Sequence, residues 1–175
     1  MTLMFWELLY LDPPWEYHDR KLVRKDGKVP KAGTGACNHY DTMTLEKMAE
    51  LNMSVIAHPQ RCAMYMWVTG PHWFNPKILI DGWNSYIPLK KDQFRYCNVA
   101  FVWEKVTKNG ITYPGRGHWG FHNCEFCLLF MRGSFPVQKI VHEEVRVPHV
   151  FDTDGKIWHS AKPFIVREKI VTAMG

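Results

Sequence analysis

The sequence predicts a single α/β domain with a mostly parallel central sheet flanked by helices. Three apolar runs, at residues 5–11, 62–68 and 98–103, lack the polar–apolar alternation of a strand with one face in water. We therefore expect them to be strands buried on both faces. Segments with helical character lie between them, at 44–51 and 74–81. Strand and helix thus alternate along 175 residues, a length suited to one domain.

The first run stops at Asp12-Pro13-Pro14, because two successive prolines can continue neither a strand nor a helix. Residues 16–39 then lose all periodicity and gain Lys, Arg, Gly and Pro, which predicts a long loop of the kind that is functional or mobile. The next helix has an N-cap candidate in Thr44, and one helical face is formed by Leu45, Met48, Ala49 and Leu51.

The second apolar run ends at Thr69-Gly70-Pro71, and the third runs through Trp103. Further short strands are expected at 127–131, 137–141 and 144–147. A terminal helix is expected at 163–173, with Pro163 in its first turn, where a missing N–H does no harm. No internal repeat is present.

Composition narrows the class of protein. Hydrophobic content of 46% and charged content of 22% are those of an ordinary globular protein. No apolar run approaches the roughly 18 residues that span a bilayer, and the amino-terminal residues lack a basic leader, so we expect no membrane association and a cytoplasmic location. Five scattered cysteines fit a reducing compartment without disulfides. The net charge of +5 moderately favours a polyanionic partner.

Asp12 occupies the place where ligands collect in open α/β sheets, directly after a buried strand. A carboxylate there, on a backbone made rigid by two prolines, suits the amino group of a flat base. The lone pair of that amine is delocalised into the ring, so the amine must donate its hydrogens to acceptors on the enzyme. Asp12 and a turn carbonyl that Pro14 keeps free and rigid would be these acceptors. Trp15 can stack on the base or wall its pocket. The alternative is that Asp12-Pro13-Pro14 is simply a tight turn.

These residues resemble the N6-adenine methyltransferase family, which includes the catalytic subunit of the messenger-RNA adenosine methyltransferase and many bacterial and phage DNA adenine methyltransferases. The resemblance starts at Leu11-Asp12-Pro13-Pro14-Trp15 and continues in the family's order over most of the chain. The later segments are Tyr40-Asp41-Thr42-Met43, Trp67-Val68-Thr69-Gly70, Trp103-Glu104-Lys105, Gly115-Arg116-Gly117-His118-Trp119 with His122 and Glu125 behind it, and His159-Ser160-Ala161-Lys162-Pro163.

The resemblance implies a Rossmann-like methyltransferase domain over residues 1–175 that uses S-adenosylmethionine without a metal. Asp12, Pro13, Pro14 and Trp15 would form the catalytic turn, with Asp12 and Pro13 also near the sulfonium end of the cofactor. Lys162 would face the cofactor carboxylate or a phosphate. The substrate side would be formed by Tyr40, Arg116, His118, Trp119, His122 and Glu125. Family members usually hold the cofactor's ribose with a strand and loop past the last helix and its adenine with residues upstream of the catalytic strand, so the resemblance assigns no ribose or adenine ligands among these residues.

Several alternatives stay open from the sequence. DNA is the preferred substrate, RNA is the second, and a homo- or heterodimer is possible. The chain could also be a non-catalytic nucleic-acid-binding partner, although an intact Asp12-Pro13-Pro14-Trp15 argues against this. A metal-dependent hydrolase is a third alternative, because Cys124 and Cys127 have the spacing of a zinc knuckle, which His118 or His122 would have to complete.

Overall fold

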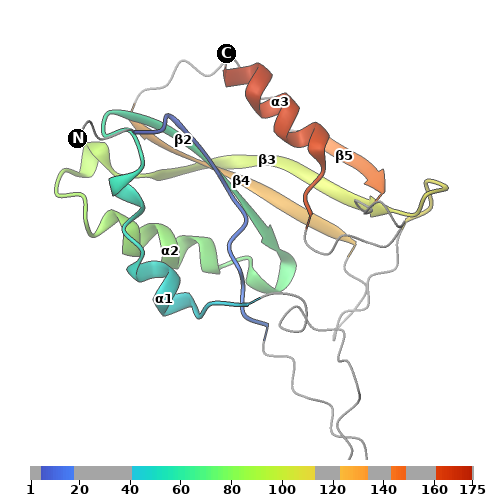
Figure 1. The fold of residues 1–175 in the computed structure, drawn as a ribbon, viewed down its shortest axis with the longest axis horizontal. Helices are drawn as coiled ribbons and strands as arrows, with labels where there is room; N and C mark the ends of the chain where they lie inside the picture. The colour runs from blue at the N-terminus through green and yellow to red at the C-terminus, as the bar shows by residue number, and fades with distance from the viewer. Residues whose placement is uncertain (1–4, 18–40, 113–122, 134–142, 149–160, 175) are drawn as a thin grey trace, which may run out of the picture.

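The computed structural model describes residues 5–17, 41–112, 123–133, 143–148 and 161–174, and their architecture is a three-layer α/β sandwich (Figure 1). Helices α1 and α2 lie on one face of a central sheet, and α3 lies on the other. The sheet strands are β1 (Leu8–Leu11), β2 (Arg61–Thr69), β3 (Arg95–Val106), β4 (Cys124–Gly133) and β5 (Glu143–Pro148).

The strand order is β1-β2-β4-β3-β5. Strands β1 and β2 are parallel, as are β3 and β5, whereas β4 runs antiparallel to both of its neighbours. Four of the five described strands therefore point in one direction, and the predicted mostly parallel sheet is confirmed. Because β4 is reversed, its first residues lie at the edge of the sheet where β2 and β3 end.

Two cores, one on each face of the sheet, follow from the alternation of side chains along β2. Seven consecutive residues of this strand are buried, as expected for a strand covered on both faces. Cys62, Met64, Met66 and Val68 belong to the core under α1 and α2. Ala63, Tyr65 and Trp67 point the other way, into the core that contains Val166 and Ile170 of α3.

The helices begin where the local chemistry predicts. Helix α1 (Leu45–Glu50) follows Thr44, whose side chain caps it by accepting a hydrogen bond from the Lys47 amide at 3.4 Å. Helix α2 (Asn75–Asn84) has a proline in its first turn, and Trp83 Nε1 ties it to α1 by donating to the Met48 carbonyl at 2.8 Å. Helix α3 (Phe164–Met174) starts directly after Pro163. Short 3-10 helices cover Met53–Val55, Gly70–His72 and Lys90–Asp92.

The predicted elements are confirmed at these positions, with ends that differ by a few residues. The apolar run at 5–11 forms only the four-residue strand β1, and Trp6 makes an isolated bridge with Ala57. The strand expected at 137–141 lies outside the described residues. Within the described part of the chain, no helix combines the length and apolar character needed to cross a membrane.

Candidate active site

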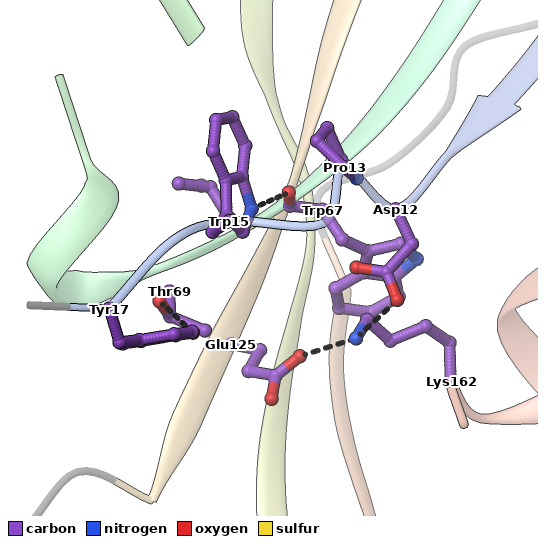
Figure 2. A pocket seen from close by; sticks show the side chains of 9 residues that line it. Asp12, Pro13, Trp15, Tyr17, Trp67, Thr69, Glu125 and Lys162 are labelled. Carbon is purple, nitrogen blue, oxygen red and sulfur yellow. Dashed lines mark hydrogen bonds and ion pairs between the residues drawn. The ribbon is translucent and has the colours of Figure 1, made fainter. Parts of the chain in front are cut away.

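Four side chains from distant parts of the sequence meet at one edge of the sheet. Asp12 directly follows β1, Thr69 is the last residue of β2, and Glu125 is the second residue of the reversed strand β4. Lys162 comes from the segment that leads into α3. They surround a small solvent-open cleft that is lined by Asp12, Pro13, Trp15, Tyr17, Trp67, Val68, Thr69, Glu125 and Lys162 (Figure 2). This is the carboxyl-end crevice where open α/β sheets bind ligands.

The proline turn is fixed by its own backbone. The Trp15 amide donates to the Pro13 carbonyl at 2.8 Å, and the Met43 amide donates to the Pro14 carbonyl at 2.9 Å. The prediction that the turn leaves its carbonyl free is therefore wrong, because both proline carbonyls already accept a hydrogen bond. A carbonyl oxygen has two lone pairs, so each can still accept a second hydrogen bond.

Trp15 anchors this turn to β2. Its side chain is 3% exposed, and its indole N–H donates to the Trp67 carbonyl at 3.2 Å. The ring stacks on His72 with centroids 5.5 Å apart, and Tyr17 meets the same imidazole edge-on at 4.4 Å. Tyr17 also shares a 3.0 Å hydrogen bond with Thr69 across the cleft. Trp15 thus contributes to the cleft wall while its face is covered by His72.

An alternating chain of charges runs through the cleft. The Lys162 ammonium lies 2.9 Å from Asp12 Oδ2 and 3.2 Å from Glu125 Oε2, as Figure 2 shows. The Lys105 ammonium lies 2.5 Å from the other Glu125 oxygen, Oε1. The side chains of Lys162 and Glu125 are only 10% exposed, whereas that of Asp12 is 35% exposed. Two cations and two carboxylates therefore balance one another in a mostly buried network.

Two tryptophans form the apolar floor under this network. The Lys162 ammonium lies 5.9 Å from the centroid of the Trp67 ring, and that of Lys105 lies 5.1 Å from Trp103. These distances are those of cation–π contacts. The two indoles meet edge to face at 6.3 Å, and Trp67 Nε1 donates to the Tyr10 hydroxyl at 2.7 Å. The lysine heads are therefore held by aromatic faces as well as by carboxylates.

The network shifts the acidity of its members in different directions. Burial raises the pKa of Asp12, and the attraction of Lys162 offsets only part of that rise. Burial also acts to raise the pKa of Glu125, but Lys162 and Lys105 together outweigh it, so this pKa lies below its ordinary value. Burial acts to lower the pKa of Lys162, but the two carboxylates leave it raised. Glu125 and Lys162 are thus held as ions, while Asp12 is the carboxylate best suited to take up a proton.

The structure brings together the predicted residues Asp12, Pro13, Trp15, Glu125 and Lys162 around one cleft, and Pro14 completes their turn. The other predicted substrate residues lie outside the described residues, as does the basic stretch at 20–31. They are Tyr40, Arg116, His118, Trp119 and His122.

Sequence reasoning missed five residues of the cleft and its network. No role was predicted for four residues in segments that follow the family's order, Trp67, Val68, Thr69 and Lys105. Tyr17 stands just beyond the proline turn. A signal for Thr69 was available, because it ends a buried strand at the edge where Asp12 follows another. Lys105 carried no such signal, since its partner Glu125 depends on the pairing of β3 with β4.

The two cysteines with knuckle spacing do not share a site. Strand β4 pairs regularly with β3 from Cys124 to Cys127, so these two residues, three apart, point to opposite faces. Cys127 is fully buried in the core under α3, whereas the Cys124 thiol contacts the Asn123 side chain. Among the described residues, no group of three or more His, Cys, Asp or Glu side chains is arranged to hold a metal ion.

Comparisons with known proteins agree on one group of relatives. The family model named MT-A70 matches residues 6–174. The chain is 27% identical over 173 residues to the Type II methyltransferase M.MunI of Mycoplasma sp, a match that covers 94% of this chain and 66% of that protein. It is 25% identical over 151 residues to a Medicago truncatula protein named as an MT-A70-like N(6)-adenosine-methyltransferase, covering 85% of this chain and 20% of that protein. The chain thus spans less than two thirds of the length of either relative.

Proposed function

The chain belongs to the MT-A70 family, and on that basis we propose that it is an S-adenosylmethionine-dependent methyltransferase that methylates the N6 amine of adenine in DNA. The observation that carries this proposal is the cleft itself. A carboxylate, Asp12, stands on a rigid proline turn at the carboxyl end of a strand, and a buried lysine, Lys162, lies 2.9 Å from it. The names of both relatives support methyl transfer, and that of the plant relative supports the N6 position of adenine.

The residues around the cleft fit the amino-acid end of the cofactor. That end carries a carboxylate, an ammonium and a sulfonium, so it needs a buried cation beside a carboxylate. Lys162 would hold its carboxylate, and Asp12 would face its positive groups. The cleft is small and open to solvent, so it suits one end of the cofactor or one base rather than a whole cofactor. When bound, S-adenosylmethionine supplies an electrophilic methyl group on sulfur.

Asp12 performs two tasks in this proposal. Its carboxylate accepts a hydrogen from the exocyclic amine, and the second lone pair of the Pro13 carbonyl accepts the other, which turns the nitrogen lone pair toward the methyl group. Bound S-adenosylmethionine would supply the methyl group to this nitrogen, and the amine would then have one proton to lose. A carboxylate whose pKa is raised by burial is suited to take that proton and pass it to solvent. The protein otherwise acts mainly by positioning the two reactants.

The remaining predicted residues keep their roles as proposals. Tyr40 would close over the base, and the segment with Arg116, His118 and Trp119 would contact the nucleic acid, together with His122. Glycine, a cation and a stacking ring in one segment suit an unpaired base. If the target lies in a duplex, the adenine has to be flipped out before it can reach Asp12.

DNA is the preferred substrate because the match that covers 94% of the chain is to a bacterial Type II methyltransferase. RNA is the alternative, favoured by the name of the plant relative. A non-catalytic partner is disfavoured by the assembled cleft, whereas a homo- or heterodimer of the active chain stays a proposal. Such a partner does not need Asp12, Glu125 and Lys162 in one network.

The test is incubation of the protein with methyl-labelled S-adenosylmethionine and matched DNA and RNA oligonucleotides, both single- and double-stranded. The products are digested to nucleosides and separated. We expect label in N6-methyl-2′-deoxyadenosine. Label in N6-methyladenosine would instead establish the RNA alternative, and the absence of label from every oligonucleotide would contradict the proposal. Protein with Asp12→Asn is the matched control.

A further inference from the structure

Lys105 is the member of the charge network for which the proposed function has no task. Resting on that function, we propose that Lys105 is a positioning residue that acts through Glu125. It holds one oxygen of Glu125 so that Lys162 stays shared between Glu125 and Asp12, and Asp12 remains a charged acceptor for the amine.

The place of Lys105 is fixed by the pairing of two strands. Trp103 pairs with Glu125 between β3 and β4, and Lys105 is the next residue of β3 on the same face as Trp103. Its backbone N–H donates to the Asn123 carbonyl at 2.7 Å, which anchors it just beyond that pair. The ammonium lies between the Trp103 ring and Glu125 Oε1, and the side chain is 19% exposed. This geometry presents Lys105 to Glu125 rather than to the open cleft.

The contribution of Lys105 follows from the two oxygens of Glu125. Lys105 occupies Oε1 at 2.5 Å, so Oε2 is left to face Lys162 at 3.2 Å. Lys162 stands closer to Asp12, at 2.9 Å. Without Lys105, the buried Glu125 carboxylate would have Lys162 as its remaining cation. Lys162 would then be drawn from Asp12 toward Glu125. The network would then hold two carboxylates for one ammonium, an arrangement that favours uptake of a proton by one of them.

The other titratable groups that face the charge network, Tyr10 and Cys127, remain neutral. Tyr10 faces the network from β1, and burial raises its pKa to about 12. Cys127 faces it from β4, and burial raises the pKa of its thiol as well. Among the described residues, the charges that face Asp12 are thus Lys162, Glu125 and Lys105. Removal of Lys105 therefore raises the proton affinity of the carboxylates, and Asp12 is the one whose pKa is already raised.

The first test measures the carboxylates directly and requires no activity. Carboxyl-¹³C NMR titration of the full chain is compared for wild type, Lys105→Met and Lys105→Arg. We expect Lys105→Met to move the midpoints of both Glu125 and Asp12 upward, that of Glu125 by about one pH unit or more, the usual effect of losing an adjacent opposite charge, and Lys105→Arg to restore most of both shifts. Lys77→Met is the control, because Lys77 pairs with Asp81 on the exposed surface of α2. An unchanged Asp12 midpoint in Lys105→Met would overturn the proposal.

The second test is a double-mutant cycle on methyl transfer. We expect Lys105→Met to lower kcat/KM about tenfold near neutral pH and to move the acidic limb of its pH profile upward. In a Glu125→Gln background the same change should have less than about a twofold effect, because its target is gone. This background also lacks the buried charge, so Lys105→Met can be studied there even if it unfolds the wild type. A full tenfold loss in that background would mean that Lys105 contacts the substrate itself. Absence of transfer by the wild type would refute the proposed function, while the NMR titration would still decide the role of Lys105.

Discussion

Replacing Asp12 with Asn separates the catalytic role of this residue from its structural role. Asn keeps the size of the side chain but removes the charge and presents an amide that can donate toward the adenine amine. Burial raises the pKa of Asp12, so the folded protein favours the neutral form more than the unfolded chain does. Ionised Asp12 therefore lowers the free energy of unfolding above its pKa, and Asn removes that cost.

The opposing contribution is the ion pair with Lys162. The Asp12 side chain is 35% exposed, so solvent screens its attraction to Lys162, and Lys162 retains Glu125 at 3.2 Å. The two contributions have opposite signs, and we expect the free energy of unfolding to change by about 1 kcal/mol or less. Activity should respond very differently. Loss of a positioned proton acceptor lowers rates by about 10²- to 10⁴-fold, which corresponds to about 3–5 kcal/mol in the barrier.

The assay pairs two measurements on one protein sample. Urea unfolding at pH 7 gives the change in stability, and transfer of labelled methyl groups to an adenine-containing oligonucleotide gives the rate. Asp81→Asn is the control, since it removes an exposed carboxylate of α2. Transfer within tenfold of wild type by Asp12→Asn would refute the mechanism. A loss of more than about 3 kcal/mol in the unfolding free energy, the range for breaking a buried pair, would show that Asp12 is mainly structural.

Three other perturbations follow from the structure. Lys162→Met should lower the unfolding free energy by about 3 kcal/mol at neutral pH, because it removes a cation from a buried pair. The ionised Glu125 stabilises the fold above its unfolded pKa of 4.5, and this stabilisation is lost as the pH falls through its lower folded pKa. The difference in unfolding free energy between Lys162→Met and wild type should therefore shrink below pH 4.5. Equal stability of the two proteins in urea unfolding at pH 7 would contradict this. Gly133→Ala should lower the free energy of unfolding by more than about 3 kcal/mol, since φ is +65° and a Cβ would lie 1.7 Å from the Gln60 carbonyl oxygen. Gly110→Ala, at φ +76° in open space, should lower it by about 1 kcal/mol. Thermal unfolding measures both. Equal losses would be inconsistent with that contact. The predicted loop at 16–39 follows the proline turn, and we expect four of its basic residues to contact nucleic-acid phosphates, Lys21, Arg24, Lys25 and Lys28. Neutralising them should make the salt dependence of nucleic-acid binding shallower by about 0.9 per lost phosphate contact, and an unchanged slope would argue against these contacts.

Local chemistry in the sequence was enough to predict the elements that carry the site. The apolar run before Asp12 and the two prolines after it place a carboxylate at a strand end. Thr44 and Pro163 mark two helix starts, and both are confirmed. These features depend on residues only a few positions apart, so a one-dimensional pattern contains them.

The direction of β4 cannot be predicted from the pattern of residues along the chain. A run such as 124–133 is equally apolar whether it pairs parallel or antiparallel. The direction of β4 decides that Glu125 stands at the strand end beside Asp12 instead of at the opposite edge. It also decides that Lys105 meets Glu125, and that Cys124 and Cys127 are separated.

The sequence predicts the α/β class, the proline turn with Asp12 and the lysine that precedes the last helix. Three features depend on the folded chain: the hydrogen bonds to the Pro13 and Pro14 carbonyls, the stacking of Trp15 on His72, and the place of Lys105 in the charge network. The physical reason is that periodicity and capping act over a few residues. Which charges become neighbours in a low-dielectric cleft depends instead on strand order and direction, and these are set by packing over the whole domain.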